Sequence, residues 1–108
     1  MPLLESQIEK AIVSYAKKRG ALSYKFASPS NRGVPDRIFF FEGATLLMEI
    51  KRTGQKPTPL QKHTMKTLTD AGVAVVWCDS VELGKKQIDG LVFGFGPSKD
   101  TCTCCDAL

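Results

Sequence analysis

Apolar residues near the start of the chain recur at spacings of three and four, the period of a helix that buries one face. They predict an amphipathic helix over residues 3–19, which Gly20 ends. The segment ALSYKFA, residues 21–27, carries apolar residues at 22, 24 and 26 and therefore predicts a half-buried strand. The following SPSNRGVP, residues 28–35, breaks all periodicity and predicts a loop.

Two nearly continuous apolar runs come next, at residues 37–41 and 45–50, and the turn Glu42-Gly43-Ala44 joins them. Runs of this length next to a turn predict a hairpin of two buried strands. The hairpin matters most for function, because charged residues enter it at both ends.

The second half of the chain predicts four further elements. They are a helix over about residues 59–71, a strand at 73–78, a short helix over 79–89 and a last strand at 91–95. Helices and strands in this order predict an α/β fold with a central mixed β-sheet flanked by α-helices.

Length and composition are those of one compact domain. The chain has 108 residues, 43% hydrophobic and 24% charged, which is typical of an ordinary globular protein, so disorder is not the default expectation. We predict a domain over residues 1–96 and a flexible tail over 97–108. No segment has the pattern of a secretory signal or a membrane span, so we expect a cytoplasmic protein with no membrane partner.

Three of the four cysteines, Cys102, Cys104 and Cys105, crowd the predicted tail. A zinc site needs four ligands, and no second cluster accompanies them. We therefore expect loose thiols, or thiols that bridge two chains, in the reducing interior of a cell.

The charge balance suits an anionic partner without identifying it. Fifteen Lys and Arg against eleven Asp and Glu give a net charge of +4, and the isoelectric point is near 9.0. Because many small basic proteins bind no nucleic acid, charge alone does not decide, and the motifs must.

The informative motif is Pro35-Asp36, followed thirteen residues after Asp36 by Glu49-Ile50-Lys51. Strand side chains alternate, so Glu49 and Lys51 point to one face while Ile50 points into the core. Each residue alone fits an ordinary turn or a solvated strand. Together they place two carboxylates on adjacent strands, and burying unpaired carboxylates is costly unless something compensates them.

A magnesium ion is the economical compensation, because it takes oxygen ligands, often from one or two carboxylates. Asp36 and Glu49 supply carboxylates, and Ile50 can add its backbone carbonyl. Metal-bound water becomes a nucleophile near neutral pH, and the Lys51 ammonium could orient that water or stabilise a phosphate under attack. These residues suffice to hydrolyse a phosphodiester.

The chain resembles the VRR-NUC domains, a branch of the PD-(D/E)XK nucleases. The resemblance rests on four segments within residues 4–82: ESQIEKAI, YKFASPSNRGVPDRI, LLMEIKRTGQKPTPLQ and AGVAVVWCDSVE. It implies a restriction-endonuclease-like fold and Mg²⁺-dependent hydrolysis of DNA, with Mn²⁺ as a substitute and no small-molecule cofactor.

The resemblance also implies roles for single residues. Asp36 and Glu49 match the metal-binding acids, assisted by the carbonyl of Ile50, and Lys51 matches the catalytic lysine. Gln61 matches a glutamine near the active site. Glu9 matches a first-helix acid of junction resolvases, with Glu5 as the competing choice, because Glu5 also suits the first turn of a helix for its dipole.

The loop around residues 28–37 is the predicted DNA-contacting segment, because it combines positive charge with groups that hydrogen-bond phosphates. The predicted DNA-binding residues are Lys25, Ser28, Asn31, Arg32 and Arg37. Gly33 would let the backbone approach closely.

The stand-alone form of the domain is similar to phage Holliday-junction resolvases, which implies a homodimer acting on branched DNA. Residues 81–95 carry surplus apolar side chains and are the predicted dimer contact. The alternatives are a non-catalytic DNA-binding or scaffold protein with the same fold, and a nuclease acting on flaps or linear duplex.

Overall fold

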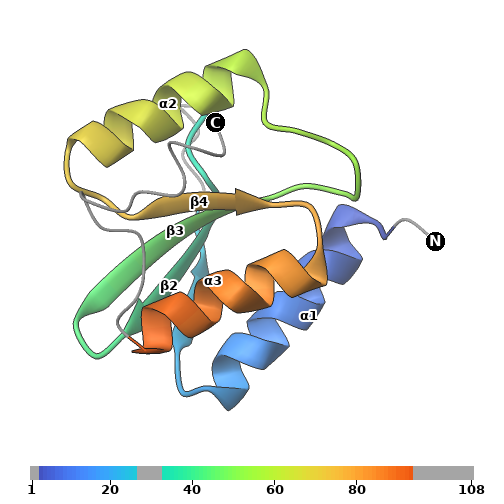
Figure 1. Cartoon of the computed structure of the whole chain (residues 1–108), viewed down its shortest axis with the longest axis vertical. Helices are drawn as coiled ribbons and strands as arrows, with labels where there is room; N and C mark the ends of the chain where they lie inside the picture. Colours follow the sequence, from blue (N-terminus) through green and yellow to red (C-terminus); the bar gives the residue numbers. More distant parts are fainter. Residues whose placement is uncertain (1–2, 27–32, 94–108) are drawn as a thin grey trace.

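The computed structural model describes residues 3–26 and 33–93 of the chain. Three helices surround one four-stranded sheet (Figure 1), which confirms the predicted mixed sheet flanked by helices with one strand fewer. The elements are α1 (Glu5–Lys18), β1 (Leu22–Lys25), β2 (Arg37–Phe41), β3 (Ala44–Ile50), α2 (Pro59–Asp70), β4 (Val75–Cys78) and α3 (Val81–Phe93).

The sheet is mixed, with strand order β1-β2-β3-β4. Strands β1, β2 and β3 are antiparallel neighbours, whereas β3 and β4 run parallel, with Glu49 opposite Trp77. The connection from β3 to β4 passes through α2, as a parallel pair requires a crossover. The predicted hairpin is therefore confirmed as β2 and β3, and Ala44 opens the second strand.

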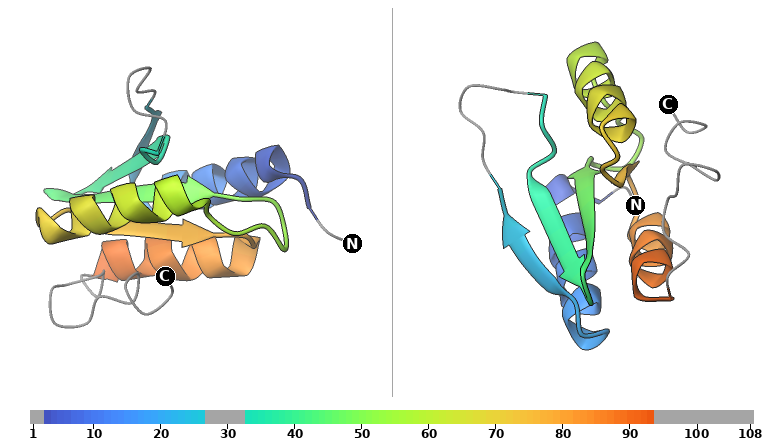
Figure 2. Two further views of the ribbon diagram at one scale, coloured as in Figure 1. Left: turned by 90° about the horizontal axis from the view of Figure 1, so that it is seen from above. Right: turned by 90° about the vertical axis from the view of Figure 1, so that its left-hand side faces the viewer.

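The two faces of the sheet are covered unequally. Helices α1 and α3 pack on one face, and α2 packs on the other (Figure 2). The α1/α3 face holds the larger core, to which α1 contributes Ile8, Ile12 and Ala16. The α2 face holds a smaller cluster built around Leu47, Met65 and Val75. Because a single helix covers the α2 face, part of this face remains open.

Helix α3 corrects one sequence prediction. Residues 91–93, expected to begin a last strand, continue the helix that starts at Val81. Buried Gly84, Ile88 and Leu91 are spaced as one helical stripe that faces α1. A short apolar run does not distinguish a strand from a buried helical segment, and packing against α1 decided in favour of the helix. Gly94 and Phe95 lie outside the described residues.

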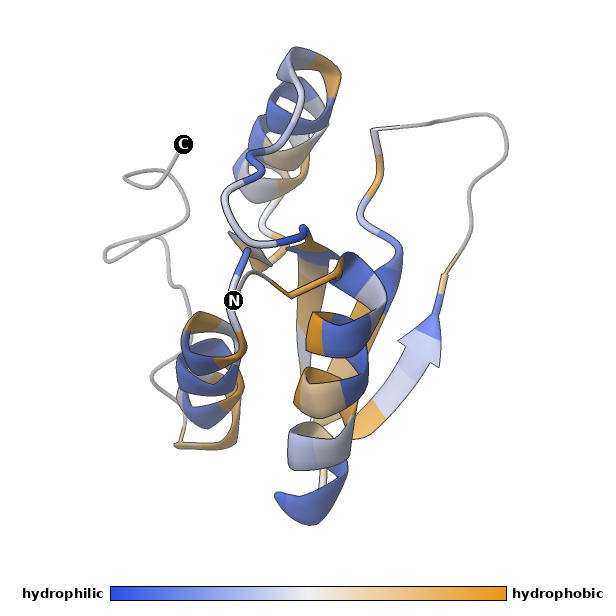
Figure 3. Ribbon diagram, turned by 90° about the vertical axis from the view of Figure 1, so that its right-hand side faces the viewer, coloured by the Kyte–Doolittle hydropathy of each residue, from blue (hydrophilic) through white to orange (hydrophobic). Residues whose placement is uncertain are grey.

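Strand β1 forms as predicted, but its apolar side is not half-buried. Leu22, Tyr24 and Phe26 are 60%, 57% and 43% exposed. They alternate toward the α2 side of the sheet, where α2 reaches only as far as β3, β4 and part of β2. Figure 3 shows this strand at the rim of the molecule, with an apolar start and a polar end.

Candidate active site

Alternation along β3 decides which residues can form a site. Leu46, Met48 and Ile50 enter the core on the α1/α3 face, so Leu47, Glu49 and Lys51 face the α2 side. The prediction that Ile50 points into the core is therefore confirmed.

Glu49 and Lys51 are each only 7% exposed, and they are the buried charged residues of the described chain. The Lys51 Nζ lies 3.7 Å from a Glu49 carboxylate oxygen. This ion pair excludes the interpretation of the two residues as a solvated strand face.

Asp36 lies at the start of β2 on the same side of the sheet. Its backbone carbonyl accepts a hydrogen bond of 2.7 Å from the Phe26 amide, which holds it next to the end of β1. Pro35 before it is fully buried. The negative charge of Asp36 acts on Glu49 and raises the pKa of that carboxyl. The structure thus brings together Asp36, Glu49 and Lys51, the three residues that the sequence placed at the centre.

The pKa of Glu49 is raised to about 7. Burial is the main cause, Asp36 and Glu5 add to it by their negative charge, and Lys51 opposes it. Lys51 therefore compensates the buried carboxylate only in part, and a further cation near Glu49 would stabilise its charged form.

The residues present fit a hard divalent cation that takes few of its ligands from the protein and the rest from water. Within residues 3–26 and 33–93, no group of three or more His, Cys, Asp and Glu side chains is arranged to hold a metal ion. Mg²⁺, however, commonly binds through one or two carboxylates and keeps several waters. The under-compensated Glu49 next to Asp36 matches that requirement.

The first-helix acid that acts on this cluster is Glu5, not Glu9. The Glu9 carboxylate accepts hydrogen bonds from Arg37 Nε at 3.0 Å and Nη2 at 2.5 Å. Arg37 pairs with Met48 in the sheet, so its side chain projects to the α1/α3 face, opposite to Glu49. Glu5, one turn earlier, is the helix α1 residue whose charge raises the pKa of Glu49. The expected placement of Glu9 is thus corrected.

Arg37 is also poorly placed for the DNA contact that the sequence suggested. Its side chain is 14% exposed, and besides Glu9 it donates to the Ser23 hydroxyl at 3.2 Å. Lys25, also a predicted DNA-binding residue, keeps 65% of its side chain exposed, with Nζ 4.0 Å from Glu9. The predicted Ser28, Asn31 and Arg32 lie outside the described residues.

Gln61 lies in the first turn of helix α2 and caps the start of this helix. Its side-chain oxygen accepts from the Thr58 amide at 2.9 Å, while the Thr58 hydroxyl accepts from the Gln61 amide at 3.1 Å. This reciprocal capping box fixes the first turn of α2. A pattern of threonine followed three residues later by glutamine already signals such a cap in the sequence.

Gly33 holds the segment before Asp36 against α2. A Cβ at this position would lie 2.9 Å from the Leu60 carbonyl oxygen and would also collide with the Thr64 side chain. The close approach that the sequence suggested for DNA is therefore made to the first turns of α2.

Sequence reasoning missed a hollow of about 410 Å³ at the end of β3, lined by Leu3, Leu4, Arg52, Thr53, Gly54 and Gln55. The residues after Lys51 are tied in place by Thr53, whose amide donates to the Leu3 carbonyl at 3.2 Å, and by Gly54, whose amide donates to Asp79 at 3.1 Å. In the sequence, the feature that could have pointed to this hollow was the position of Arg52 directly after Lys51.

The predicted dimer segment mostly covers the chain's own core. Leu91 is buried, and Val81 and Val92 pack against the core of the α1/α3 face. Leu83 and Phe93 stay exposed, and the Phe93 ring lies 4.7 Å from the Arg19 guanidinium. Within residues 81–93, the large apolar side chains that remain exposed are therefore Leu83 and Phe93.

No protein-family model matches the chain. Over 80 residues, which are 73% of this chain and 86% of the relative, it is 42% identical to a protein of Acyrthosiphon pisum secondary endosymbiont phage 1 named "Putative nuclease p44". A solved VRR-NUC domain structure has a TM-score of 0.73 to this chain, at 23% sequence identity, and the match covers 79% of this chain and 94% of that one. The second comparison shows that the fold is the one that the sequence motifs implied.

Proposed function

The chain belongs to one family with the phage nuclease p44 and has the VRR-NUC fold, and from this premise we propose that it is a metal-dependent DNA endonuclease. The observation that carries the proposal is the burial of Glu49 and Lys51 side by side on the sheet face that Asp36 shares. Burying an ion pair is costly, and replacing it with apolar residues would often cost nothing. The pair therefore serves chemistry rather than stability.

The residues divide the work. Asp36, Glu49 and the backbone carbonyl of Ile50 would hold Mg²⁺, for which Mn²⁺ would substitute. When bound, this ion supplies a water of lowered pKa and positive charge for the scissile phosphate. Lys51, held 3.7 Å from Glu49, presents a fixed ammonium to the charge that develops on the phosphate. The negative charge of Glu5, at the start of α1, acts on the carboxyl of Glu49 and raises its pKa.

The proposed substrate is branched DNA such as a Holliday junction, cut by a homodimer whose two sites make paired incisions. Two symmetric incisions need two chains, because the described residues hold one such cluster. The net charge of +4 favours association with the DNA backbone.

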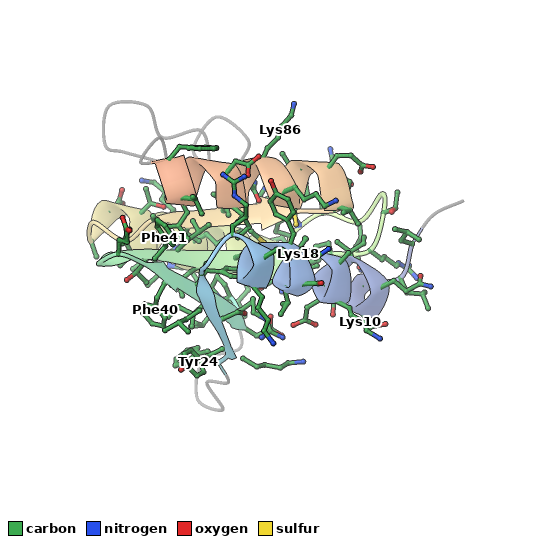
Figure 4. All side chains as sticks on the ribbon, turned by 90° about the horizontal axis from the view of Figure 1, so that it is seen from below. Lys10, Lys18, Tyr24, Phe40, Phe41 and Lys86 are labelled. Carbon is green, nitrogen blue, oxygen red and sulfur yellow. The ribbon has the colours of Figure 1, made fainter. Side chains whose placement is uncertain are left out.

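The test is cleavage of three labelled DNAs, a four-way junction, a flap and a linear duplex, with and without Mg²⁺. We expect the junction to be cut fastest, EDTA to abolish cleavage and Mn²⁺ to restore it. Lys51→Ala should lower the rate at least about 100-fold, the usual loss when a preorganised charge is removed from the reacting site. Lys86→Ala is the matched control, because Lys86 is exposed on α3, away from the site (Figure 4).

The other candidate function is a non-catalytic DNA-binding protein with the same fold. Tight junction binding without cleavage under every metal condition would establish that function and exclude the nuclease. Fastest cleavage of flap or duplex would retain the nuclease and exclude junction selectivity.

A further inference from the structure

Three exposed aromatic side chains lie at the edge of the sheet, Tyr24 on β1, Phe26 directly after β1 and Phe40 on β2, and are hereafter called the aromatic strip. Phe40 is 37% exposed, and Tyr24 and Phe26 are more exposed still. The rings of Tyr24 and Phe40 meet edge to face with centroids 6.2 Å apart. In Figure 4 both rings project away from α1 and α3.

The register places the aromatic strip on the same sheet face as the candidate site. Tyr24 lies opposite Ile38, which packs toward α2, and Phe40 lies opposite Thr45, on the side of β3 that carries Glu49. Phe26 continues the alternation and donates its amide to the Asp36 carbonyl. The aromatic strip therefore starts beside a proposed metal-binding acid and runs away from it along the open half of the sheet.

Apolar residues scattered over a surface are common, whereas neighbouring ones on one face often mark an interaction site. Aromatic side chains offer about 150–250 Å² each, so three that are roughly half exposed present on the order of 300 Å². A stable protein interface needs about 800 Å² per partner. The aromatic strip alone is too small for a second protein and large enough for one or two planar groups.

We propose that the aromatic strip binds unpaired nucleobases of the DNA strand whose phosphate reaches Asp36 and Glu49. Every base offers a flat π-face, and stacking on aromatic side chains is the usual way in which proteins hold single strands. Lys25, between Tyr24 and Phe26 in sequence, points to the opposite face of the edge strand, with its Nζ 4.0 Å from Glu9, so the aromatic strip itself holds the strand by stacking and not by charge. Bases inside a duplex have no free face, so the strip selects DNA with unpaired nucleotides next to the cleavage position.

This inference rests on the proposed function, and its test separates the two by measuring binding without cleavage. A fluorescein-labelled 12-nucleotide oligothymidylate and a blunt 12-base-pair duplex are titrated with protein in EDTA, and anisotropy is read. Tyr24→Ala should weaken oligothymidylate binding at least about fivefold, the lower end of the loss per stacked base. Duplex binding should change by less than about twofold.

Two variants control for the nature of the contact. Tyr24→Phe keeps the ring and should retain oligothymidylate binding. Leu22→Ala removes an exposed aliphatic side chain from the same strand and face, and should leave binding unchanged. A 2-aminopurine within the oligonucleotide should be quenched by the wild-type protein and less by Tyr24→Ala, because fluorescence reports stacking directly.

Unchanged oligothymidylate binding in Tyr24→Ala, or an equal loss in Leu22→Ala, would overturn the inference. A change of molecular mass in light scattering on Tyr24→Ala, without a loss of binding, would assign the surface to a second copy of the chain and would likewise overturn it. Lys51→Ala serves as the separating variant. It should fail to cut, and if it cuts normally the proposed function fails while the oligothymidylate binding of Tyr24→Ala still decides the role of the strip.

Discussion

The charge state of Glu49 depends on what surrounds its carboxyl group. Without a bound cation its pKa is about 7 in the folded chain, against 4.5 for the ordinary side chain. The folded protein therefore keeps this proton between these two pH values while the unfolded chain has lost it. The sign follows: the metal-free protein loses stability as pH rises from about 4.5 to 7, by up to about 3 kcal/mol.

Glu49→Gln should remove this loss. We expect the metal-free variant to be more stable than the wild type at pH 8, and the two to differ little at pH 4.5, in urea denaturation followed by circular dichroism. Glu82→Gln, an exposed glutamate on α3, is the control and should follow the wild type. Equal pH dependence in Glu49→Gln and wild type would show that Glu49 is not the titrating group.

Glu5 and Glu9 lie one helical turn apart, and we expect their substitutions to have different effects, one on stability and the other on cleavage. Glu9→Gln removes the charged partner of a mostly buried Arg37, so it should cost about 1–3 kcal/mol of stability. Glu5 is exposed, and its charge acts on Glu49. Glu5→Gln should therefore keep stability within about 0.5 kcal/mol and lower the rate of DNA cleavage.

Denaturation midpoints and single-turnover rates of the two variants decide between the acids. A loss of cleavage confined to Glu9→Gln, at conditions where that variant is fully folded, would restore Glu9 as the acid of the site.

Among the elements, α1 and α3 are joined by a contact that only glycine permits. A Cβ at Gly84 would lie 2.7 Å from Ile12 Cγ1 and still closer to the end of that side chain. Ile12 is fully buried and cannot turn away freely. Gly84→Ala should therefore destabilise the protein by about 1–3 kcal/mol, the usual cost of overpacking.

The double variant Gly84→Ala/Ile12→Val tests this cause. Ile12→Val alone should cost about 0.5–1.5 kcal/mol, but in the Gly84→Ala background it should cost less or stabilise, because it removes the nearest colliding atom. Additive free energies of unfolding would mean that α3 simply shifts, and the close contact would not be the cause.

The start of α2 carries a second prediction at this scale. Thr58→Ala removes the acceptor for the Gln61 amide and should cost about 1 kcal/mol, whereas Thr58→Ser keeps the hydroxyl and should cost little. If both variants lose the same stability in thermal denaturation, the hydroxyl does not cap the helix.

At the scale of the molecule, one chain of 11.8 kDa carries one candidate site, and the proposed substrate calls for two. We predict a mass near 24 kDa (2 × 11.8) by light scattering across a dilution series. A constant mass of a single chain would contradict the homodimer and, with it, paired incision by one particle. Since residues 81–93 mostly serve the core, Leu83→Ala should not by itself dissociate the dimer.

The described helices include none that is long and apolar enough to cross a membrane. In the same residues the buried charged side chains are Glu49, in β3, and Lys51, directly after it, although the protein interior favours apolar groups.

The sequence by itself determined the alternation of helices and strands, the β2–β3 hairpin, and the common face of Glu49 and Lys51. These follow from local periodicity, because a strand side chain alternates whatever the strand packs against. Tertiary structure alone decided that the Arg37 guanidinium pairs with the Glu9 carboxylate, that residues 91–93 are helical, and that the apolar side of β1 stays exposed. Each depends on which element lies opposite, and a contact between residues far apart in the chain leaves no mark on the local pattern of either one.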